Sequence, residues 1–552
     1  MQFETRYFGA STVASSPEAT GVTFAPDTLR KPTHFVGTLG DELAFREAIS
    51  ALHDVVVSDL RFKPKDRTEY EAWLAQQEEA FLADALARHG DVTARIGEVQ
   101  TELNALWNEQ ARVMKPFWDA RKRFYDYTYK KYRDLWFVLD PVITVHPDEV
   151  FFECFSQDES SYGRLGCSYE VFREISDFAC GTTNVDYSAA LYNEFQKIRT
   201  YKDTQLTVDP SGFEVQTEHE DTYKEVKIDL PDSWVRGFLQ VSSAMTLPAK
   251  RVDLHPMDVH NLLFVLKRRK EREGPRSLRF HLTPGEPVRI VVEPWNVEIR
   301  CPRSIYRGSE PDEIRVWGRR RLMILERLIP VAKSFSVFLL GTGLPSFYLA
   351  DLGHMSFTLG LSGWTRNDWS RQGNFDLMAP RADVDTVTKQ EVFRALCETW
   401  QEAPESLARR TGFDRSTVLG ALAAYTQAGR AIYDLNKGVY RVRELSREPL
   451  PLEKLRFANE REQAAERFLE ADAVTVNAEH LPDGRTVLTG TVRDGDTTFE
   501  PTLILDSDER IVEATCGCSF YVRNKLMKGP CEHMLALRRA YTQRTRFAGM
   551  LN

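Results

Sequence analysis

Two different periods of apolar residues divide the chain into helical and β-rich stretches. Between residues 61 and 139, apolar side chains recur at steps of three, four or seven, as in Val99, Leu103 and Leu106, with few Gly or Pro residues. This period is typical of an amphipathic helix. Because His89-Gly90 interrupts the pattern, it predicts two long helices that form a helical hairpin.

Short runs of β-branched residues, bounded by Pro and Gly, dominate much of the rest of the first half. In residues 213–385 such runs, for example 288–292, predict a β-rich domain that a helix at 257–273 interrupts. Residues 1–60 and 140–212 mix both kinds of signal and are expected to form an N-terminal α/β segment and an α+β segment. A chain of 552 residues has room for about three to five domains, so an α+β multidomain protein is predicted.

Residues 386–446 carry a compact pattern of three short helices and two strands. Asp414 is suited to cap the third helix, and Gly429 to end it. The strands that follow are joined at 436–438 by Asn-Lys-Gly, which suits a tight hairpin. This arrangement resembles the winged helix-turn-helix family.

The resemblance implies that the third helix enters a DNA major groove. Four positions are expected to face outward, and none has a side chain that forms hydrogen bonds: Leu419, Gly420, Ala423 and Ala424. Polar contacts to DNA are left to three side chains: Arg415, Thr417 and Gln427. Winged helices also serve as docking modules, so protein contact or internal packing is the alternative.

Charge and cysteine usage narrow the functional classes. The chain has 81 acidic and 72 basic residues and a net charge of −9, which excludes a wholly basic nucleic-acid coat but allows a local basic patch. Eight cysteines are too few for a disulfide-rich secreted domain. Residues 1–25 show no signal-peptide pattern, and no apolar run reaches the roughly 20 residues of a membrane-spanning helix. We therefore expect a cytoplasmic protein that does not associate with membranes.

Three of the cysteines gather beside a histidine near the end of the sequence. Cys516 and Cys518 are followed by a spacer of 12 residues, 519–530, and then by Cys531 and His533. Three thiolates and one imidazole complete a tetrahedral set for a structural zinc ion, with no position left open for water. A chance cluster or a disulfide is the alternative interpretation.

These four residues match the pattern of the SWIM zinc finger family: Cys-x-Cys, a variable spacer and Cys-x-His. Strand signals from residue 474 onward and a helix after the last ligand fit the same family, so residues 447–552 are identified as a SWIM ββα zinc finger domain. The resemblance implies one bound structural zinc ion and recognition of DNA or of a protein partner. Gly517 is expected to be needed where the backbone turns between the first two ligands.

The end of the chain has a local excess of positive charge. Residues 519–552 contain seven Lys and Arg against one Glu, a net charge of +6 (7 − 1). This excess favours binding of nucleic acid, with DNA as the first expectation. Five side chains are expected to make the contacts: Arg523, Lys525, Lys528, Arg538 and Arg539. A solvated helix face is the alternative.

The sequence shows no local arrangement of a nucleophile, a base and an orienting group, so no catalytic activity is expected. Distant residues that converge in the fold are the alternative. Segments 233–238 and 316–321 look similar to larger bacterial SWIM proteins, which are thought to occur alongside MoxR-type AAA+ ATPases and von Willebrand A-domain proteins. This similarity implies a second function, that of an adaptor or scaffold for protein partners in such an ATPase system.

Overall fold

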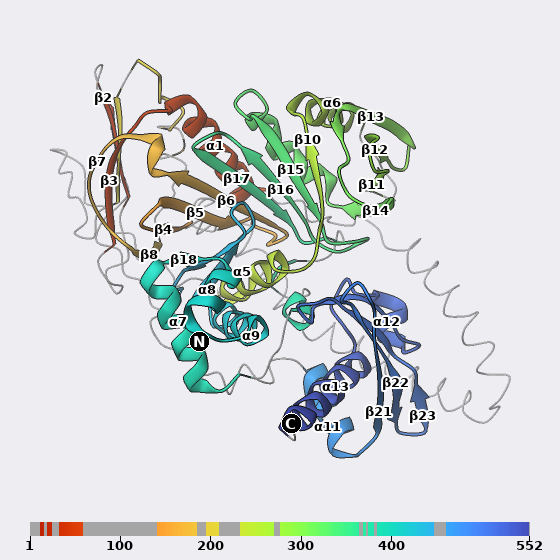
Figure 1. The fold of residues 1–552 in the computed structure, drawn as a ribbon. Helices are drawn as coiled ribbons and strands as arrows, with labels where there is room; N and C mark the ends of the chain where they lie inside the picture. Colours follow the sequence, from red (N-terminus) through yellow and green to blue (C-terminus); the bar gives the residue numbers. More distant parts are fainter. Residues whose placement is uncertain are drawn as a thin grey trace, which may run out of the picture. The chain divides into compact units, whose positions relative to one another are not determined.

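The computed structural model describes the chain as a mixed α and β structure with several antiparallel sheets (Figure 1). The described residues are 12–15, 19–24, 33–58, 141–184, 192, 195–201, 203–208, 232–269, 276–363, 368–370, 374–379, 384–445 and 460–550. The helical hairpin predicted over 61–139 lies outside them. The α+β class is confirmed.

A five-stranded sheet contains the strands nearest the N-terminus. Its order is β1-β2-β9-β3-β7, and only β2 and β9 pair in parallel. The strands are β1 (Thr12–Ser15), β2 (Ala19–Phe24), β9 (Asp203–Val208), β3 (His34–Leu39) and β7 (Phe172–Ala179). Helix α1 (Glu42–Val56) follows β3 and begins at Asp41, whose carboxylate accepts a hydrogen bond from the Ala44 amide. Residues 1–60 are therefore not a separate segment, because β7 and β9 complete their sheet.

An eight-stranded sheet forms the centre of the described structure. Its order is β10-β15-β16-β17-β6-β5-β4-β8, with every pair antiparallel. The strands are β10 (Lys250–Leu254), β15 (Ser334–Leu339), β16 (Ser346–Asp351), β17 (Met355–Leu361), β6 (Ser161–Ser168), β5 (Glu149–Phe155), β4 (Val142–Val145) and β8 (Gly181–Asn184). Met355 of β17 lies opposite Cys167 of β6. The predicted division between 140–212 and 213–385 is therefore wrong, because strands from both ranges build one sheet.

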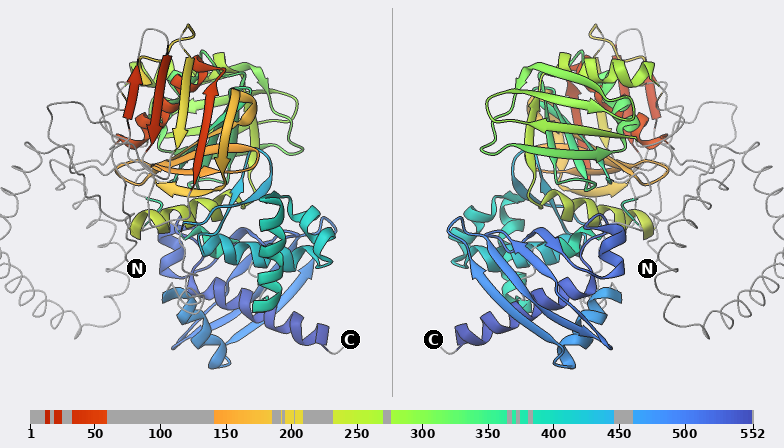
Figure 2. Two further views of the ribbon diagram at one scale, coloured as in Figure 1. Left: turned by 90° about the vertical axis from the view of Figure 1, so that its left-hand side faces the viewer. Right: turned by 90° about the vertical axis from the view of Figure 1, so that its right-hand side faces the viewer.

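A four-stranded antiparallel sheet accounts for the rest of the predicted β-rich region (Figure 2). It consists of β13 (Val297–Ile305), β12 (Pro287–Val292), β11 (Ser277–Leu282) and β14 (Asp312–Trp317), in that order. Helix α6 (Pro256–Arg268) packs against β13, β15 and the 3-10 helix η3 (Arg319–Leu328). Helix η3 also packs on α1, so that a shared apolar core connects this sheet to the eight-stranded one.

Residues 386–445 form three helices and a small sheet of order β18-β20-β19. The elements are α7 (Thr386–Thr399), β18 (Gln401–Glu402), α8 (Pro404–Thr411), α9 (Arg415–Gln427), β19 (Ala431–Asp434) and β20 (Val439–Val442). The carboxylate of Asp414 accepts a hydrogen bond from the Thr417 amide at 3.0 Å and caps α9, as predicted. The three helices and the hairpin expected from local sequence are confirmed.

Helix α9 is largely covered by other elements. Helix α5 (Asp232–Met245) packs against it, Leu419 is 6% exposed, and Gly420 is buried. Ala423 and Ala424 are half-buried. The expectation that these positions face outward is wrong for Leu419 and Gly420, because Leu419 packs in the apolar core of the same three helices and Gly420 is buried as well.

Buried ion pairs join the hairpin of β19 and β20 to the eight-stranded sheet. Arg441 and Arg443 are both 0% exposed. Arg441 donates to Asp434 at 2.8 Å and to Asp148 at 2.9 Å, while Arg443 donates to both carboxylate oxygens of Glu153 at 3.0 and 3.1 Å. The hairpin is thus held on the sheet by buried guanidinium groups, one of which pairs with the fully buried Glu153 and the other with the quarter-exposed Asp148.

The C-terminal region folds around its own antiparallel sheet, with order β21-β22-β24-β25 and with β23 paired to β22. Its elements are α11 (Glu460–Glu470), β21 (Val474–His480), β22 (Thr486–Asp494), β23 (Thr497–Phe499), β24 (Thr502–Leu505), β25 (Ile511–Thr515), α12 (Ser519–Asn524) and α13 (Glu532–Met550). Helix α13 packs on β21, β22 and α11. The predicted strands are confirmed, and the helix expected after the last ligand runs from Glu532 to Met550.

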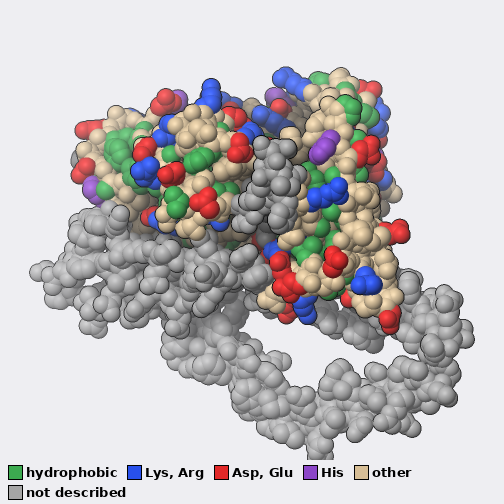
Figure 3. Space-filling model, turned by 60° about the horizontal axis from the view of Figure 1, so that its bottom comes forward, with side chains coloured by type: hydrophobic (Ala, Val, Ile, Leu, Met, Phe, Trp, Pro, Cys, Tyr) green, Lys and Arg blue, Asp and Glu red, His purple; other side chains and the backbone are tan. Residues whose placement is uncertain are grey.

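The described surface mixes both signs of charge. Basic and acidic side chains are interspersed on the face in Figure 3. Among the described helices, none combines the length and apolar character that crossing a bilayer requires.

Candidate metal centre

The four predicted ligands lie in two pairs, one after the end of a strand and the other at the start of a helix. Cys516 and Cys518 follow strand β25, and Cys518 caps helix α12 by accepting a hydrogen bond from the Tyr521 amide at 3.4 Å. Cys531 and His533 stand at the start of α13. A strand end and a helix start therefore bring two pairs, distant in sequence, to one place.

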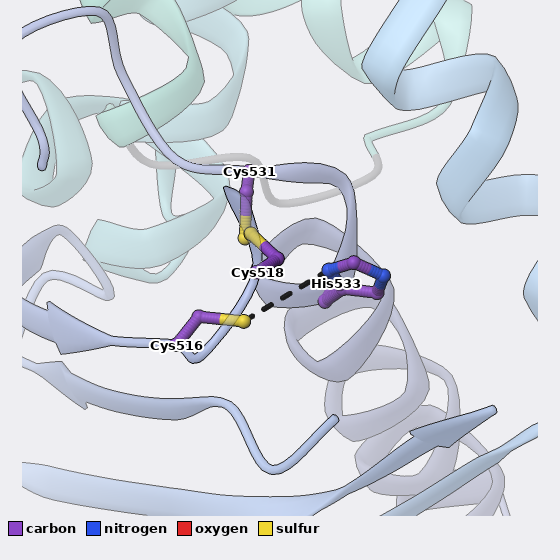
Figure 4. A group of neighbouring side chains, drawn as sticks. All are labelled: Cys516, Cys518, Cys531 and His533. Atoms are coloured by element: carbon purple, nitrogen blue, oxygen red, sulfur yellow. Dashed lines mark hydrogen bonds between the residues drawn. The ribbon is translucent and has the colours of Figure 1, made fainter. Parts of the chain in front are cut away.

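The side chains of these residues converge on one point (Figure 4). Their ligand atoms all lie within 4.8 Å of one another, and all four residues are buried. Cys516 Sγ lies 3.9 Å from His533 Nδ1, which identifies Nδ1 as the ring atom that faces the sulfurs. The group is compatible with a single metal ion held by three sulfurs and one nitrogen.

Electrostatics inside the cluster favour a bound cation. Hydrogen bonds from Cys531 and His533 lower the pKa of the Cys516 thiol to about 4, against the effect of burial. The pKa of Cys531 is raised far above its ordinary value by its hydrogen bond to Cys516 and by burial, and burial raises that of Cys518. One thiolate thus suppresses ionisation of the other two sulfurs, a conflict that a divalent cation removes.

A disulfide does not account for the cluster. All eight cysteines of the chain are free thiols, including the three gathered here. The role expected for Gly517 is wrong: a Cβ at this position would have no atom within 4 Å. The turn between the first two ligands therefore accepts other residues.

The imidazole ring of His533 is fixed by three neighbours that the sequence did not reveal. Phe468 stacks on it with a centroid distance of 5.5 Å, and Phe499 lies against it at 4.2 Å. The other ring nitrogen, Nε2, lies 3.5 Å from a carboxylate oxygen of Asp494 at the end of β22. These residues carry no motif, because the packing of α11 on α13 and the pairing of β22 with β23 bring them to the start of α13.

The spacer between the ligand pairs packs against other parts of the chain. Arg461 of α11 donates to the carbonyl oxygens of Pro530 at 2.6 Å and Lys528 at 3.0 Å. Met527 packs so closely on Gly343 that a Cβ there would lie 2.6 Å from its sulfur. The metal ligands thus flank a segment that attaches the C-terminal sheet to the β-rich region.

Three of the basic residues expected to contact nucleic acid instead bind other parts of this chain. Arg538 is 5% exposed and donates to the carbonyl oxygens of Leu377, Ala379 and Glu509. Arg539 pairs with Glu466 and Glu462. Arg415 donates to Asp508 at 2.8 and 2.9 Å and pairs with Glu405. The guanidinium groups of these three residues hold α13 and α9 in place, and their contact with nucleic acid stays a prediction.

The remaining predicted contacts lie in two places. Thr417 donates its hydroxyl to Asp414 at 2.6 Å, and Gln427 is half-buried at the end of α9. Arg523 and Lys525 are exposed on or beside α12, and Lys528 is half-buried. Within the described part of the chain no ion pair involves these three cations, although Lys525 lies 4.9 Å from the centroid of the Tyr521 ring.

Comparisons with known proteins do not assign the chain to a family. No family model matches the chain, and no curated protein matches it. Among solved structures, the proliferating cellular nuclear antigen of Entamoeba histolytica matches 41% of this chain and 90% of its own length, with a TM-score of 0.29 and 9% sequence identity. A similarity of this size supports no statement about the fold or function of the chain.

Proposed function

We propose that this chain is a non-catalytic adaptor for protein partners and that residues 447–552 are a SWIM zinc finger domain that folds around one structural zinc ion. The observation that carries the proposal is the buried, closed set of Cys516, Cys518, Cys531 and His533. Four protein ligands leave no position for water or substrate, which is typical of a structural site.

Zinc is the metal that these ligands suit best. Thiolates and imidazole select zinc among the abundant divalent ions. Zinc bonds of about 2.3 Å to sulfur and 2.0 Å to nitrogen place tetrahedral ligand atoms about 3.5 to 4 Å apart, in keeping with the mutual limit of 4.8 Å. Bound there, zinc supplies the positive charge that lets three thiolates lie together.

Asp494 is expected to tune this site through His533. Because its carboxylate faces Nε2, it can accept a hydrogen bond from that nitrogen and orient Nδ1 toward the metal. Asp494→Asn should therefore weaken zinc affinity by about tenfold or more, measured by competition with a chromophoric chelator. Asp496→Asn, which changes an exposed carboxylate in the turn after β22, is the matched control and should bind zinc as tightly as the wild-type chain. Equal affinities for both variants would contradict this role.

A protein-binding role is favoured over DNA binding by the surroundings of α9. The helix that resembles a DNA-reading helix is covered in part by α5, and Arg415 at its start is held by Asp508 and Glu405. Basic and acidic side chains alternate on the face in Figure 3, whereas a surface that binds phosphates is positive along its length. Candidate partners are the MoxR-type AAA+ ATPases and von Willebrand A-domain proteins that the SWIM resemblance implies.

Nucleic-acid binding is the second candidate, and one observation favours it. Arg523, Lys525 and Lys528 form a small group of cations for which the described residues provide no carboxylate. Lys and Arg side chains bind a phosphate backbone by neutralising its charges.

A fluorescence-polarisation titration of the full chain with labelled duplex and single-stranded DNA, at two salt concentrations, separates the two candidates. The adaptor proposal predicts no salt-sensitive binding. The second candidate, nucleic-acid binding, predicts DNA binding that weakens as salt rises. It also predicts weaker binding in a variant with Arg523, Lys525 and Lys528 changed to Ala. These two results together would contradict the adaptor proposal. A change of Lys389, a half-buried lysine of α7, to Ala is the matched control and should have no effect.

A further inference from the structure

Helix α6 exposes two large apolar side chains on its outer face. Met257 is 45% exposed and Phe264 is 46% exposed. They are seven residues apart, which places them two turns apart on the same side of a helix. His260, also exposed, lies between them, with its ring centroid 6.4 Å from that of Phe264.

These side chains are not needed to hold the helix on the body of the protein. The opposite face of α6 is buried through Val259, Leu262 and Leu263, which pack with Leu322 and Leu325 of η3 around a small apolar cavity. The helix is thus apolar on two sides, and only one of them has a partner among the described residues.

The exposed charge of α6 and its end is positive. Lys267, Arg268 and Arg269 are exposed at the C-terminal end of the helix. The one carboxylate of α6, Asp258, has a 0% exposed side chain and accepts a hydrogen bond from the Ser304 hydroxyl at 2.7 Å. Cations at a helix C-terminus stabilise the helix itself, but this does not explain the exposed Met257 and Phe264.

The cations and the apolar side chains form one continuous surface. The guanidinium carbon of Arg268 lies 4.2 Å from the centroid of the Phe264 ring. Lys267 pairs with Glu326 of η3 at 2.9 Å, which leaves the positive charge of Arg268 and Arg269 in excess at this end. Beside α6, the edge strand β13 adds the exposed Arg300, which pairs with Glu298 of the same strand at 3.1 Å.

We propose that the outer face of α6 docks an acidic amphipathic helix of a protein partner, an inference that rests on the proposed adaptor function. An apolar stripe with a two-turn spacing fits the ridge of a second helix, and carboxylates on that helix complement Arg268 and Arg269. Nucleic acid fits less well, because the half of α6 around Met257 has no cation to bind phosphate.

A labelled peptide of about 18 residues, with Leu on one helical face and Glu elsewhere, is the probe. Fluorescence anisotropy with the full zinc-loaded chain should show binding, and a peptide with Lys in place of Glu should bind at least about tenfold more weakly. The double variant Met257→Ala with Phe264→Ala, and separately Arg268→Glu, should each weaken binding of the acidic peptide by about tenfold. Val387→Ala, which shortens a 64% exposed side chain of α7, should not.

Four results would overturn the proposal. The first two are no binding of the acidic peptide and equal binding of this peptide by all variants. The other two are self-association of the chain through this face and binding of an oligonucleotide that Arg268→Glu reduces but the apolar double variant does not.

To separate the docking site from the adaptor proposal, zinc content and DNA binding are measured on the same preparation. A chain that holds zinc, does not bind DNA and does not bind the peptide would remove the docking site and leave the adaptor proposal in place.

Discussion

Replacement of Cys531 by Ser is expected to release the metal ion and to unfold the C-terminal sheet and helix α13 locally. Cys531 is 0% exposed, and its side chain belongs to the group of four whose ligand atoms lie within 4.8 Å of one another (Figure 4). The free energy of metal binding at a structural site becomes folding free energy, so the loss should be about 3 kcal/mol or more. Metal analysis and hydrogen exchange of the amides in β25 and α13 measure the two effects.

The control for this variant is Cys301→Ser. Cys301 is also 0% exposed, and it lies in β13, apart from the metal ligands. This variant measures how much a buried hydroxyl in place of a thiol changes hydrogen exchange when no metal ligand is lost. If Cys531→Ser kept its metal, or if the two variants opened α13 to exchange equally, the metal would not be what holds this region together.

Replacement of Arg443 by Met is expected to lower the free energy of unfolding by about 3 to 5 kcal/mol. Its guanidinium donates to both oxygens of Glu153, whose side chain is also 0% exposed, and lies 4.9 Å from the centroid of the Phe238 ring. Removal of the arginine leaves the carboxylate of Glu153 buried, and among the described residues it keeps only the hydrogen bond that the Tyr162 hydroxyl donates at 2.7 Å. Denaturant titration measures the loss.

Two further variants serve as controls for Arg443→Met. Arg485→Met breaks an exposed pair with Asp483, in which both side chains are more than 40% exposed, and should change stability by less than about 1 kcal/mol. Addition of Glu153→Gln to Arg443→Met should restore part of the lost stability, because the buried charge disappears. A loss below about 1 kcal/mol for Arg443→Met would show that water reaches this pair.

Features that depend on neighbouring residues were predictable from the sequence. Asp414 caps α9, and the turn at 436–438 joins β19 to β20, because capping and tight turns need only a few adjacent side chains. The metal cluster was predictable for a similar reason. Short spacings place two ligands at a strand end and two at a helix start, and thiolates with imidazole indicate zinc.

Features that depend on long-range packing were not predictable from one sequence. No local pattern pairs β6 with β17, whose residues Cys167 and Met355 are opposite one another across the predicted domain boundary. Counting Lys and Arg gave the net charge near the C-terminus, but it could not show that Arg538 is buried against three carbonyl oxygens. The small residues Gly420, Ala423 and Ala424 in α9 carried a usable signal, because such a run favours close approach of another helix.

Zinc K-edge X-ray absorption of the purified full chain tests the central claim most directly. The proposed site predicts one zinc ion bonded to three sulfur atoms at about 2.3 Å and one nitrogen atom at about 2.0 Å, supplied by Cys516, Cys518, Cys531 and His533. A chain that holds no zinc, or a zinc ion bonded to oxygen or to fewer than three sulfur atoms, would contradict it.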